Sequence, residues 1–144
     1  MDDEKSRIES EPEVQSFLQS MTHALNNGAQ LIIQYRRRID RDREIKFTNT
    51  YTVAKLFPDE NPVEALKREL RQLQTENYIR TVKDSRFPKR SEMREFGKVY
   101  NDEGVYIKIR AELLTNDGQH SVFVMSFHFA ERPFTEESFP YKRK

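Results

Sequence analysis

The side chains best suited to chemistry lie in residues 104–130, which read as two β-strands around an Asn116-Asp117-Gly118 turn. Successive side chains of a strand point to opposite faces of its sheet. One parity predicts an apolar face made of Val105, Ile107, Ile109, Ala111, Leu113, Phe123, Met125, Phe127 and Phe129. The other parity predicts a polar face made of Tyr106, Lys108, Arg110, Val124, Ser126 and His128. A phenol, two cations and an imidazole on one face indicate a partner that bears phosphate.

These residue types are the ones that RNA cleavage without a metal requires. The 2′-hydroxyl must lose a proton, the leaving 5′-oxygen must gain one, and cations must stabilise the charge on the phosphorane. Histidine titrates near neutrality and is the usual acid or base, worth typically ~10²–10⁴ in rate. The pattern therefore predicts Tyr106 and His128 as proton-transfer groups. The alternatives are a hydrogen-bonded structural His128, a Tyr106 that only favours β-structure, and cations that keep an exposed face soluble.

Two further predicted strands and one basic loop add cations and aromatic rings to the same face. Strand 77–83 carries Tyr78 and Arg80 at one parity, and strand 96–100 carries Lys98 and Tyr100 at one parity. Cross-strand neighbours stand ~5 Å apart, so several such side chains can surround one phosphate. We expect Arg80 to join the catalytic pair, and the RNA-binding set to be Lys89, Arg90, Lys98, Tyr100, Lys108 and Arg110.

The composition limits the class of protein. The chain has 144 residues, of which 35% are hydrophobic and 34% charged, so we expect one domain with its core in a few patterned segments. It has no cysteine and three scattered histidines, which predicts no disulfide framework, no metal site and no other cofactor. No apolar run approaches the ~20 residues that span a bilayer. The acidic start, MDDEKSRIES, is unlike a signal peptide, so we expect a cytoplasmic protein without membrane association.

Charge is segregated along the chain although its net charge is only +1. Residues 78–110 hold nine bases against five acids, and residues 1–27 hold six acids against two bases. Segregation of this kind creates a local basic surface on a nearly neutral protein, although a solvated charged surface is the plainer interpretation.

The remaining pattern places helices before the sheet. Pro12 and the apolar spacing that follows it predict a helix over residues 11–26, and Asn61-Pro62 predicts another over residues 62–75. Shorter elements are expected as a strand at 30–35, a helical turn at 50–57, a basic loop at 84–92 and a turn at 101–104, whereas 36–46 fits either a strand or a loop.

These elements predict an α+β fold in which N-terminal helices pack on one face of a C-terminal antiparallel sheet. The expected limits are a disordered acidic tail at residues 1–10, a single domain at 11–130, and a tail at 131–144 that lies across or off the sheet.

Four short segments resemble the MqsR-type toxins, which are small bacterial mRNA interferases of the RelE-like superfamily. Residues 77–82 form an aromatic strand with a cation, and residues 96–100 form a strand that ends in valine-tyrosine. Residues 104–109 are similar to the family's "VYLKI" strand, and residues 123–128 are similar to its closing strand, which has "SF" and a base. The resemblance implies a RelE-like fold and a metal-independent, cofactor-free endoribonuclease that acts on mRNA and is restrained by an antitoxin protein.

The match to that family differs from position to position. Tyr106 matches the family's tyrosine, while Arg80 and His128 each stand where the family has a lysine. Gly97 takes the place of a glutamine in the short strand. The resemblance thus implies a toxin-type nuclease whose proton donor is an imidazole rather than an ammonium.

Two other classes of protein fit the same residues. A non-catalytic RNA-binding module would use the basic, aromatic face for stacking and backbone contacts. A protein-binding inhibitor or immunity-type protein would use the acidic tail and the arginine run at residues 36–38 as contact surfaces. Replacing His128 with alanine should abolish RNA cleavage by a nuclease and leave RNA binding mostly intact. Both RNA-directed classes predict an RNA affinity that falls steeply as salt rises, whereas the inhibitor class predicts no such affinity.

Overall fold

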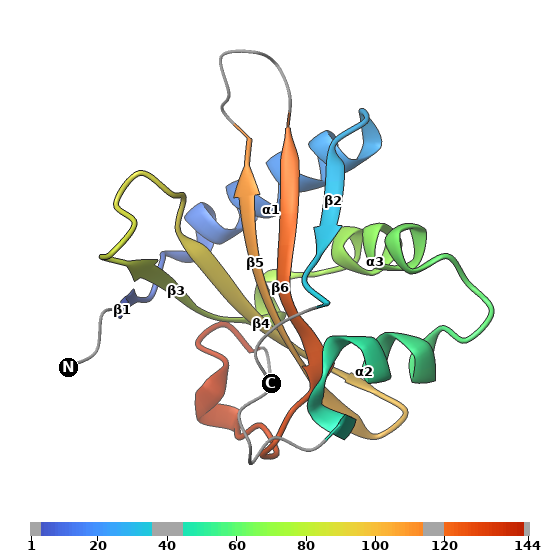
Figure 1. The fold of residues 1–144 in the computed structure, drawn as a ribbon. Helices are drawn as coiled ribbons and strands as arrows, with labels where there is room; N and C mark the ends of the chain where they lie inside the picture. The colour runs from blue at the N-terminus through green and yellow to red at the C-terminus, as the bar shows by residue number, and fades with distance from the viewer. Residues whose placement is uncertain (1–3, 36–44, 114–119, 143–144) are drawn as a thin grey trace.

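The computed structural model describes residues 4–35, 45–113 and 120–142 of the chain (Figure 1). Within them the fold is α+β, with three α-helices and a six-stranded open sheet in the order β1-β3-β4-β5-β6-β2. All neighbours in the sheet are antiparallel except β2 and β6, which run parallel. The elements are β1 (Glu4–Arg7), α1 (Glu11–Asn26), β2 (Gln30–Ile33), α2 (Asn49–Leu56), α3 (Pro62–Arg71), β3 (Tyr78–Asp84), β4 (Met93–Tyr100), β5 (Glu103–Glu112) and β6 (Ser121–Phe129).

The helices begin where capping side chains satisfy their first amide groups. Before α1, Ser10 Oγ accepts a hydrogen bond from Glu13 N, and the Glu13 carboxylate accepts one from Ser10 N. Asn61 caps α3 through Glu64 N, with Pro62 in the first turn. The helix predicted at residues 11–26 is confirmed. The one predicted at 62–75 is shorter: it ends at Arg71, and a 3₁₀ turn (Thr75–Asn77) leads into β3.

The core lies between one face of the sheet and the helices α1 and α3, which Figure 1 shows behind the sheet. Val14 and Met21 of α1 and Leu66 and Leu70 of α3 are fully buried. They pack with apolar side chains of the sheet, among them Phe96, Val105, Ile107, Ile109, Val122, Val124 and Phe127. We call this side of the sheet the helix face, and the opposite side of β3, β4, β5 and β6 the open face.

A β-bulge in β6 changes which of its side chains enter the core. Lys108 pairs with Ser126 but Ile109 pairs with Val124, so Met125 is an extra residue on the β6 side. Beyond the bulge Val122 and Val124 are fully buried, while Phe123 pairs with Arg110. The prediction that Phe123 and Met125 share the core face with Phe127 and Phe129 is therefore wrong. The same inversion moves Val124 from the predicted polar face into the core.

The connection of β4 to β5 is a two-residue turn. Tyr100 pairs with Glu103, and the two residues between them, Asn101 and Asp102, have φ values of 51° and 68°. Two positive φ values in a tight hairpin are typical of a type I′ turn, for which asparagine and aspartate are favoured. The turn predicted at residues 101–104 is confirmed.

Helix α2 closes the edge of β6 beyond the end of β2. The Asn49 amide donates to Gln34 O at 2.8 Å and to Met125 O at 2.9 Å, and its oxygen accepts from Phe127 N at 2.8 Å. Thr52 Oγ1 accepts from Phe129 N at 2.9 Å. Side chains of a helix thus satisfy the backbone groups that a neighbouring strand would otherwise pair.

The N-terminal segment belongs to the fold, so the predicted disordered tail at residues 1–10 is wrong for residues 4–10. Residues 4–7 form β1 on β3, and Arg7 binds the Glu92 carboxylate with distances of 2.7 and 3.0 Å. Glu9 is buried and accepts hydrogen bonds from the Arg94 guanidinium at 2.7 and 3.2 Å. The residues of β1 (EKSR) lack apolar alternation, and a short charged edge strand of this kind resists pairing with other chains.

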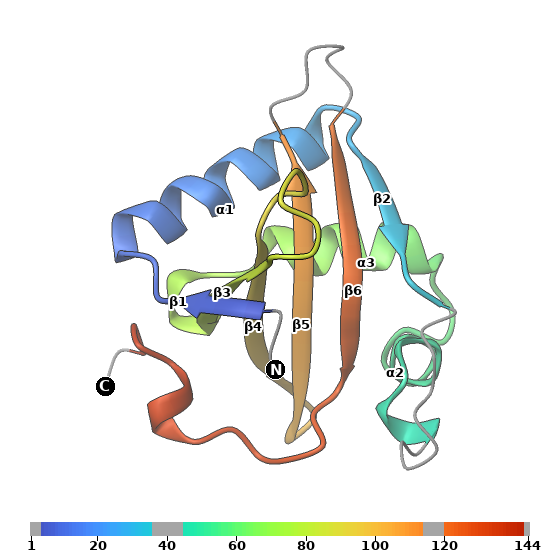
Figure 2. The same ribbon diagram turned by 60° about the vertical axis from the view of Figure 1, so that its left-hand side comes forward.

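The C-terminal segment crosses the open face, as one of the two sequence-based alternatives predicts. Phe134 and Phe139 pack where β4 has Gly97, because a Cβ there would lie 2.8 and 2.9 Å from two ring atoms of Phe134 and 3.0 Å from Phe139. Tyr141 stacks on Tyr78 with ring centroids 6.1 Å apart. Figures 1 and 2 show this segment at the lower left of the molecule.

Three sequence-based predictions fall outside the described residues. They concern the arginine run at 36–38, most of the segment 36–46, and the turn at 116–118. Of the segment 36–46, only Ile45 and Lys46 are described, in a 3₁₀ turn (Ile45–Phe47). No helix formed by the described residues is long and apolar enough to cross a membrane.

Candidate functional site

Two rows of cross-strand neighbours on the open face hold the candidate site. The first row is Gly97, Tyr106 and His128, on β4, β5 and β6. The second row is Arg80, Glu95, Lys108 and Ser126, on β3, β4, β5 and β6. Because neighbouring strands lie ~4.8 Å apart and alternate residues ~7 Å apart, the two rows cover a patch of about 14 by 7 Å.

Tyr106 and His128 are in contact. Their ring centroids lie 5.5 Å apart with planes tilted by 50°. His128 Nδ1 donates to Phe129 O at 2.9 Å, since the carbonyl can only accept. This bond places a proton on Nδ1 and leaves Nε2 as the nitrogen that can face a substrate. His128 is only 5% exposed, so the pair forms the floor of the patch rather than its rim.

Glu95 is a member of the site that the sequence reasoning missed. Its side chain is 3% exposed, its Oε1 accepts from Arg80 Nε at 2.9 Å, and its Oε2 has no hydrogen-bond partner among the described residues. A carboxylate that lies between Arg80 and Lys108 in its row supplies a second acid–base group on the face that carries the imidazole. The signal that could have found it is parity: Glu95 alternates with Gly97 on β4, and the facing residues of β5 are Lys108 and Tyr106.

A second bulge brings Arg80 to this patch. Tyr78 pairs with Phe96, but Arg80 pairs with Glu95, so the register shifts between them. Tyr78 is therefore buried in the core, and the exposed Arg80 lies on the open face. The prediction that these two residues share a face is wrong, and Arg80 lies in one row with Lys108, with Glu95 between them.

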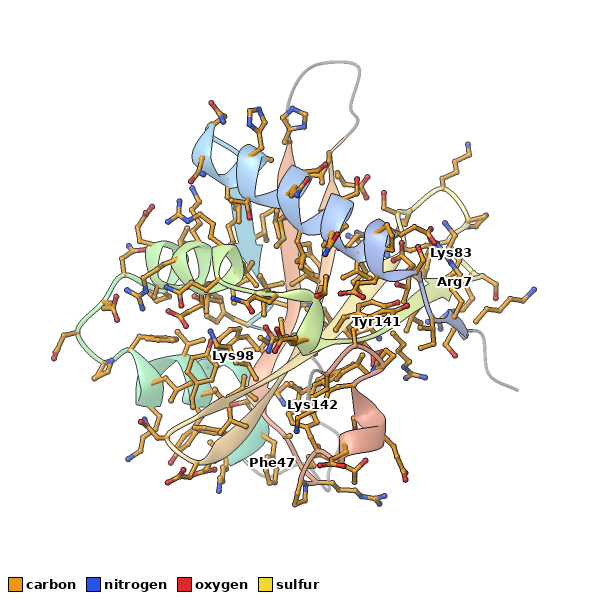
Figure 3. The ribbon with its side chains drawn as sticks, turned by 180° about the vertical axis from the view of Figure 1, so that it is seen from behind. Arg7, Phe47, Lys83, Lys98, Tyr141 and Lys142 are labelled. Carbon is orange, nitrogen blue, oxygen red and sulfur yellow. The ribbon has the colours of Figure 1, made fainter. Side chains whose placement is uncertain are left out.

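Lys98 and Tyr100 lie on the helix face, so the prediction that they share a face with Tyr106 and His128 is wrong. Lys98 pairs with the buried Val105, and Tyr100 Oη donates to Glu69 Oε1 of α3 at 2.8 Å. Burial raises the pKa of Tyr100, and the bond to Glu69 raises it further. Figure 3, the view from behind, shows Lys98 close to α2 and α3. The two residues share parity with Phe96, whose ring fills the core, and that was the available signal.

The basic loop between β3 and β4, residues 85–92, is held to the sheet by two anchors. Lys83 Nζ donates to Pro88 O at 3.0 Å and to Arg90 O at 2.5 Å. Ser91 Oγ donates to the Glu112 carboxylate at 2.7 Å. Arg90 lines a cavity between this loop and the open face, whereas Lys89 is exposed and does not line it.

The same cavity receives two predicted RNA-binding residues from the sheet, Lys108 and Arg110. The Arg110 guanidinium lies 4.9 Å from the Phe123 ring centroid. Of the nine residues predicted for the site, six therefore gather on or beside the open face: Arg80, Arg90, Tyr106, Lys108, Arg110 and His128.

A cavity of about 850 Å³ lies along α1 and away from this patch. It includes His23, His120 and the Glu9–Arg94 ion pair, but none of the six gathered residues. Arg94 is fully engaged there, since its guanidinium also lies 4.0 Å from the Phe17 ring centroid. Among the described residues no group of three or more histidine, aspartate or glutamate side chains is arranged to hold a metal ion.

Comparisons with models of protein families, with curated proteins and with solved structures found no match to this chain. The chemistry of the candidate site is defined by an imidazole with a proton on Nδ1, a buried carboxylate and a phenol, with cations on the adjoining positions.

Proposed function

We propose that this protein is a metal-independent endoribonuclease that cleaves RNA through attack of a 2′-hydroxyl on the adjacent phosphate. The observation that carries the proposal is the contact of Tyr106 with His128 in the row next to Glu95 and Lys108. This arrangement offers two proton-transfer groups and a cation within the reach of one phosphodiester.

The proposed roles follow from the chemistry of each group. Glu95, as the carboxylate, accepts the proton of the 2′-hydroxyl through Oε2, and His128, as the imidazolium protonated on both nitrogens, donates the Nε2 proton to the leaving 5′-oxygen. Lys108 and Arg80 stabilise the negative charge that develops on the phosphorane. Tyr106 orients the phosphate or the imidazole from its position between Gly97 and His128.

The proposal extends to the biological class. A RelE-like, MqsR-type toxin of the bacterial cytoplasm, acting on mRNA and held by an antitoxin protein, fits a small α+β domain with this face. The basic open face is also the surface that an acidic antitoxin segment would cover, because it carries the substrate-binding cations.

A non-catalytic RNA-binding module is the second candidate, and the burial of His128 favours it. An imidazole that is 5% exposed must be reached by substrate after a neighbouring segment moves. A binding module would need only the exposed cations, with His128 as a structural partner of Tyr106.

One assay distinguishes these two candidates. Purified protein in EDTA is mixed with a fluorescent RNA, and cleavage is followed for the wild type, His128→Ala and Lys98→Ala. The proposal predicts that His128→Ala lowers the cleavage rate by ~10²–10⁴. Lys98→Ala, which removes a cation from the helix face, should leave the rate within about twofold because surface changes away from a site are near neutral. Binding without cleavage by all three proteins would contradict the nuclease proposal.

A further inference from the structure

A cavity of about 240 Å³ lies between the loop of residues 85–92 and the open face. Figure 2 shows the connection from β3 to β4 in front of β5. The loop contributes Arg86, Phe87 and Arg90, and the sheet contributes Lys108 and Arg110. The volume is below the roughly 300–1,000 Å³ of sites for drug-sized ligands, so it suits a small ligand or one unit of a polymer.

The charge of the lining selects an anion. Four cationic side chains, those of Arg86, Arg90, Lys108 and Arg110, line the cavity together with the carboxylate of Asp84. Asp84 is engaged by Arg86 at 3.0 and 3.1 Å, and this contact lowers the pKa of its carboxyl. Lys108 is only 7% exposed, so its ammonium acts from a region of low dielectric, where its attraction for an anion is stronger than in water.

The lining also provides a flat surface for a base. Phe87 is 42% exposed, and the guanidinium of Arg90 lies 4.1 Å from its ring centroid. Bases stack on aromatic rings and on guanidinium planes. Met93 and Met125 add adaptable apolar surface to the same cavity.

We infer that this cavity binds one nucleotide of an RNA strand, with the phosphate at Lys108 and Arg110 and the base against the Phe87–Arg90 stack. The inference builds on the proposed function, because Lys108 lines the cavity and also stands two residues from Tyr106 on β5. Two residues of a strand span ~7 Å, so the bound nucleotide is a neighbour of the scissile phosphate. The cavity is then the subsite that sets the cleavage sequence.

Binding of small probes to the whole protein tests the inference. The four nucleoside 3′-monophosphates, inorganic phosphate and a nucleoside are titrated by calorimetry or by amide chemical shifts, at low and at physiological salt. We expect nucleotides to bind more tightly than phosphate, and the nucleoside to bind least. Nucleotide affinity should also fall as salt rises, because phosphate contacts displace counterions.

Matched variants then locate the site. Arg110→Gln should weaken nucleotide binding at least tenfold, whereas Lys98→Gln, which removes one charge from the helix face, should change it less than twofold. Arg90→Ala should weaken binding in the same way, and Lys89→Ala in the same loop should not. Phe87→Ala should lower nucleotide affinity by about 5- to 150-fold, the loss of one stacked base, while phosphate affinity is retained.

Three results would overturn the inference. They are equal effects of Arg110→Gln and Lys98→Gln, equal affinities for phosphate and nucleotide, and no binding of any probe at low salt. Its failure is distinguishable from failure of the proposed function. Nucleotide binding by a protein that does not cleave RNA preserves the subsite and removes the nuclease, and RNA cleavage without nucleotide binding does the reverse.

Discussion

Gly97→Ala should destabilise the protein through Phe134. The new Cβ would lie 2.8 and 2.9 Å from two ring atoms of Phe134, whereas ordinary contacts are 3.4–4 Å, so the ring must move by more than half an ångström. Overpacking of this kind costs ~1–3 kcal/mol. Replacing a strand glycine also recovers ~0.5–1 kcal/mol, because alanine loses less entropy on folding. The expected net loss in the free energy of unfolding is therefore about 0–2.5 kcal/mol.

The same substitution should cost nothing once the ring is removed. In a Phe134→Ala background the two contacts below 3.0 Å are removed and the 3.0 Å contact with Phe139 stays, so Gly97→Ala becomes neutral or slightly stabilising. Urea unfolding of the wild type, both single variants and the double variant gives the interaction energy, expected at ~1–3 kcal/mol between contacting residues. An equal cost of Gly97→Ala in both backgrounds would refute the packing of the C-terminal segment against β4.

Three further predictions concern the edges of the sheet and its ion pairs. Thr52→Val should lower the free energy of unfolding by ~1–3 kcal/mol, because it leaves the buried Phe129 N–H without a hydrogen bond. The control Thr50→Val, on the exposed side of α2, should change the free energy of unfolding by no more than ~0.5 kcal/mol. Equal effects of the two substitutions in urea unfolding would contradict the contact between α2 and the edge of β6. Tyr100→Phe should cost ~1.5–3 kcal/mol at neutral pH, through the lost bond to Glu69. Folding raises the Tyr100 pKa, so the contribution of its phenol is complete below pH ~10 and is lost as pH rises further. The stability difference between the wild type and Tyr100→Phe should therefore shrink above pH ~10, and a constant difference from neutral pH to pH ~11 would argue against this contribution. Folding lowers the Glu92 pKa, chiefly through its hydrogen bond to Arg7. This half-exposed ion pair therefore stabilises the fold by at most ~1 kcal/mol at pH values above the ordinary glutamate pKa of ~4.3, and the stabilisation is lost as pH falls. Glu92→Gln should remove this acid dependence, and an unchanged dependence in thermal unfolding would contradict the role of the pair in holding β1.

Local patterns predicted the elements that have local causes. The helix over residues 11–26 follows from its capping residues and apolar spacing, and the Asn101-Asp102 turn follows from residues that accept positive φ. The alternation in β5 also placed Tyr106, Lys108 and Arg110 on one face together with His128 of β6. These features depend on neighbours in the chain or on a strict period of two.

The remaining features depend on contacts between distant segments. The bulges at Ile79 and Met125 each invert a strand's parity, and they moved Arg80 away from Tyr78 and Phe123 away from the core. A bulge is stabilised by the packing of whole strands, so no single residue type marks it. Glu95 became a candidate only when β4 was placed between Arg80 and Lys108.

The edge of the sheet shows the same limit. β1 consists of polar residues whose pairing depends on Glu92 and β3, far along the chain. Lys98 and Tyr100 looked like members of a basic face, although their shared parity with Phe96 places them among the helices. Polar residue types alone therefore did not identify the face that they occupy.

The ends that the protein leaves on cleaved RNA test the central claim most directly. An RNA oligonucleotide is incubated with wild-type protein in EDTA, and the products are identified by mass spectrometry, with a matched strand that carries a single 2′-deoxynucleotide at the cleaved position. The account predicts a 2′,3′-cyclic phosphate and a 5′-hydroxyl, no cleavage at the deoxy position, and loss of both products with His128→Ala. Intact RNA, 5′-phosphate ends, or cleavage at the deoxy position would contradict it.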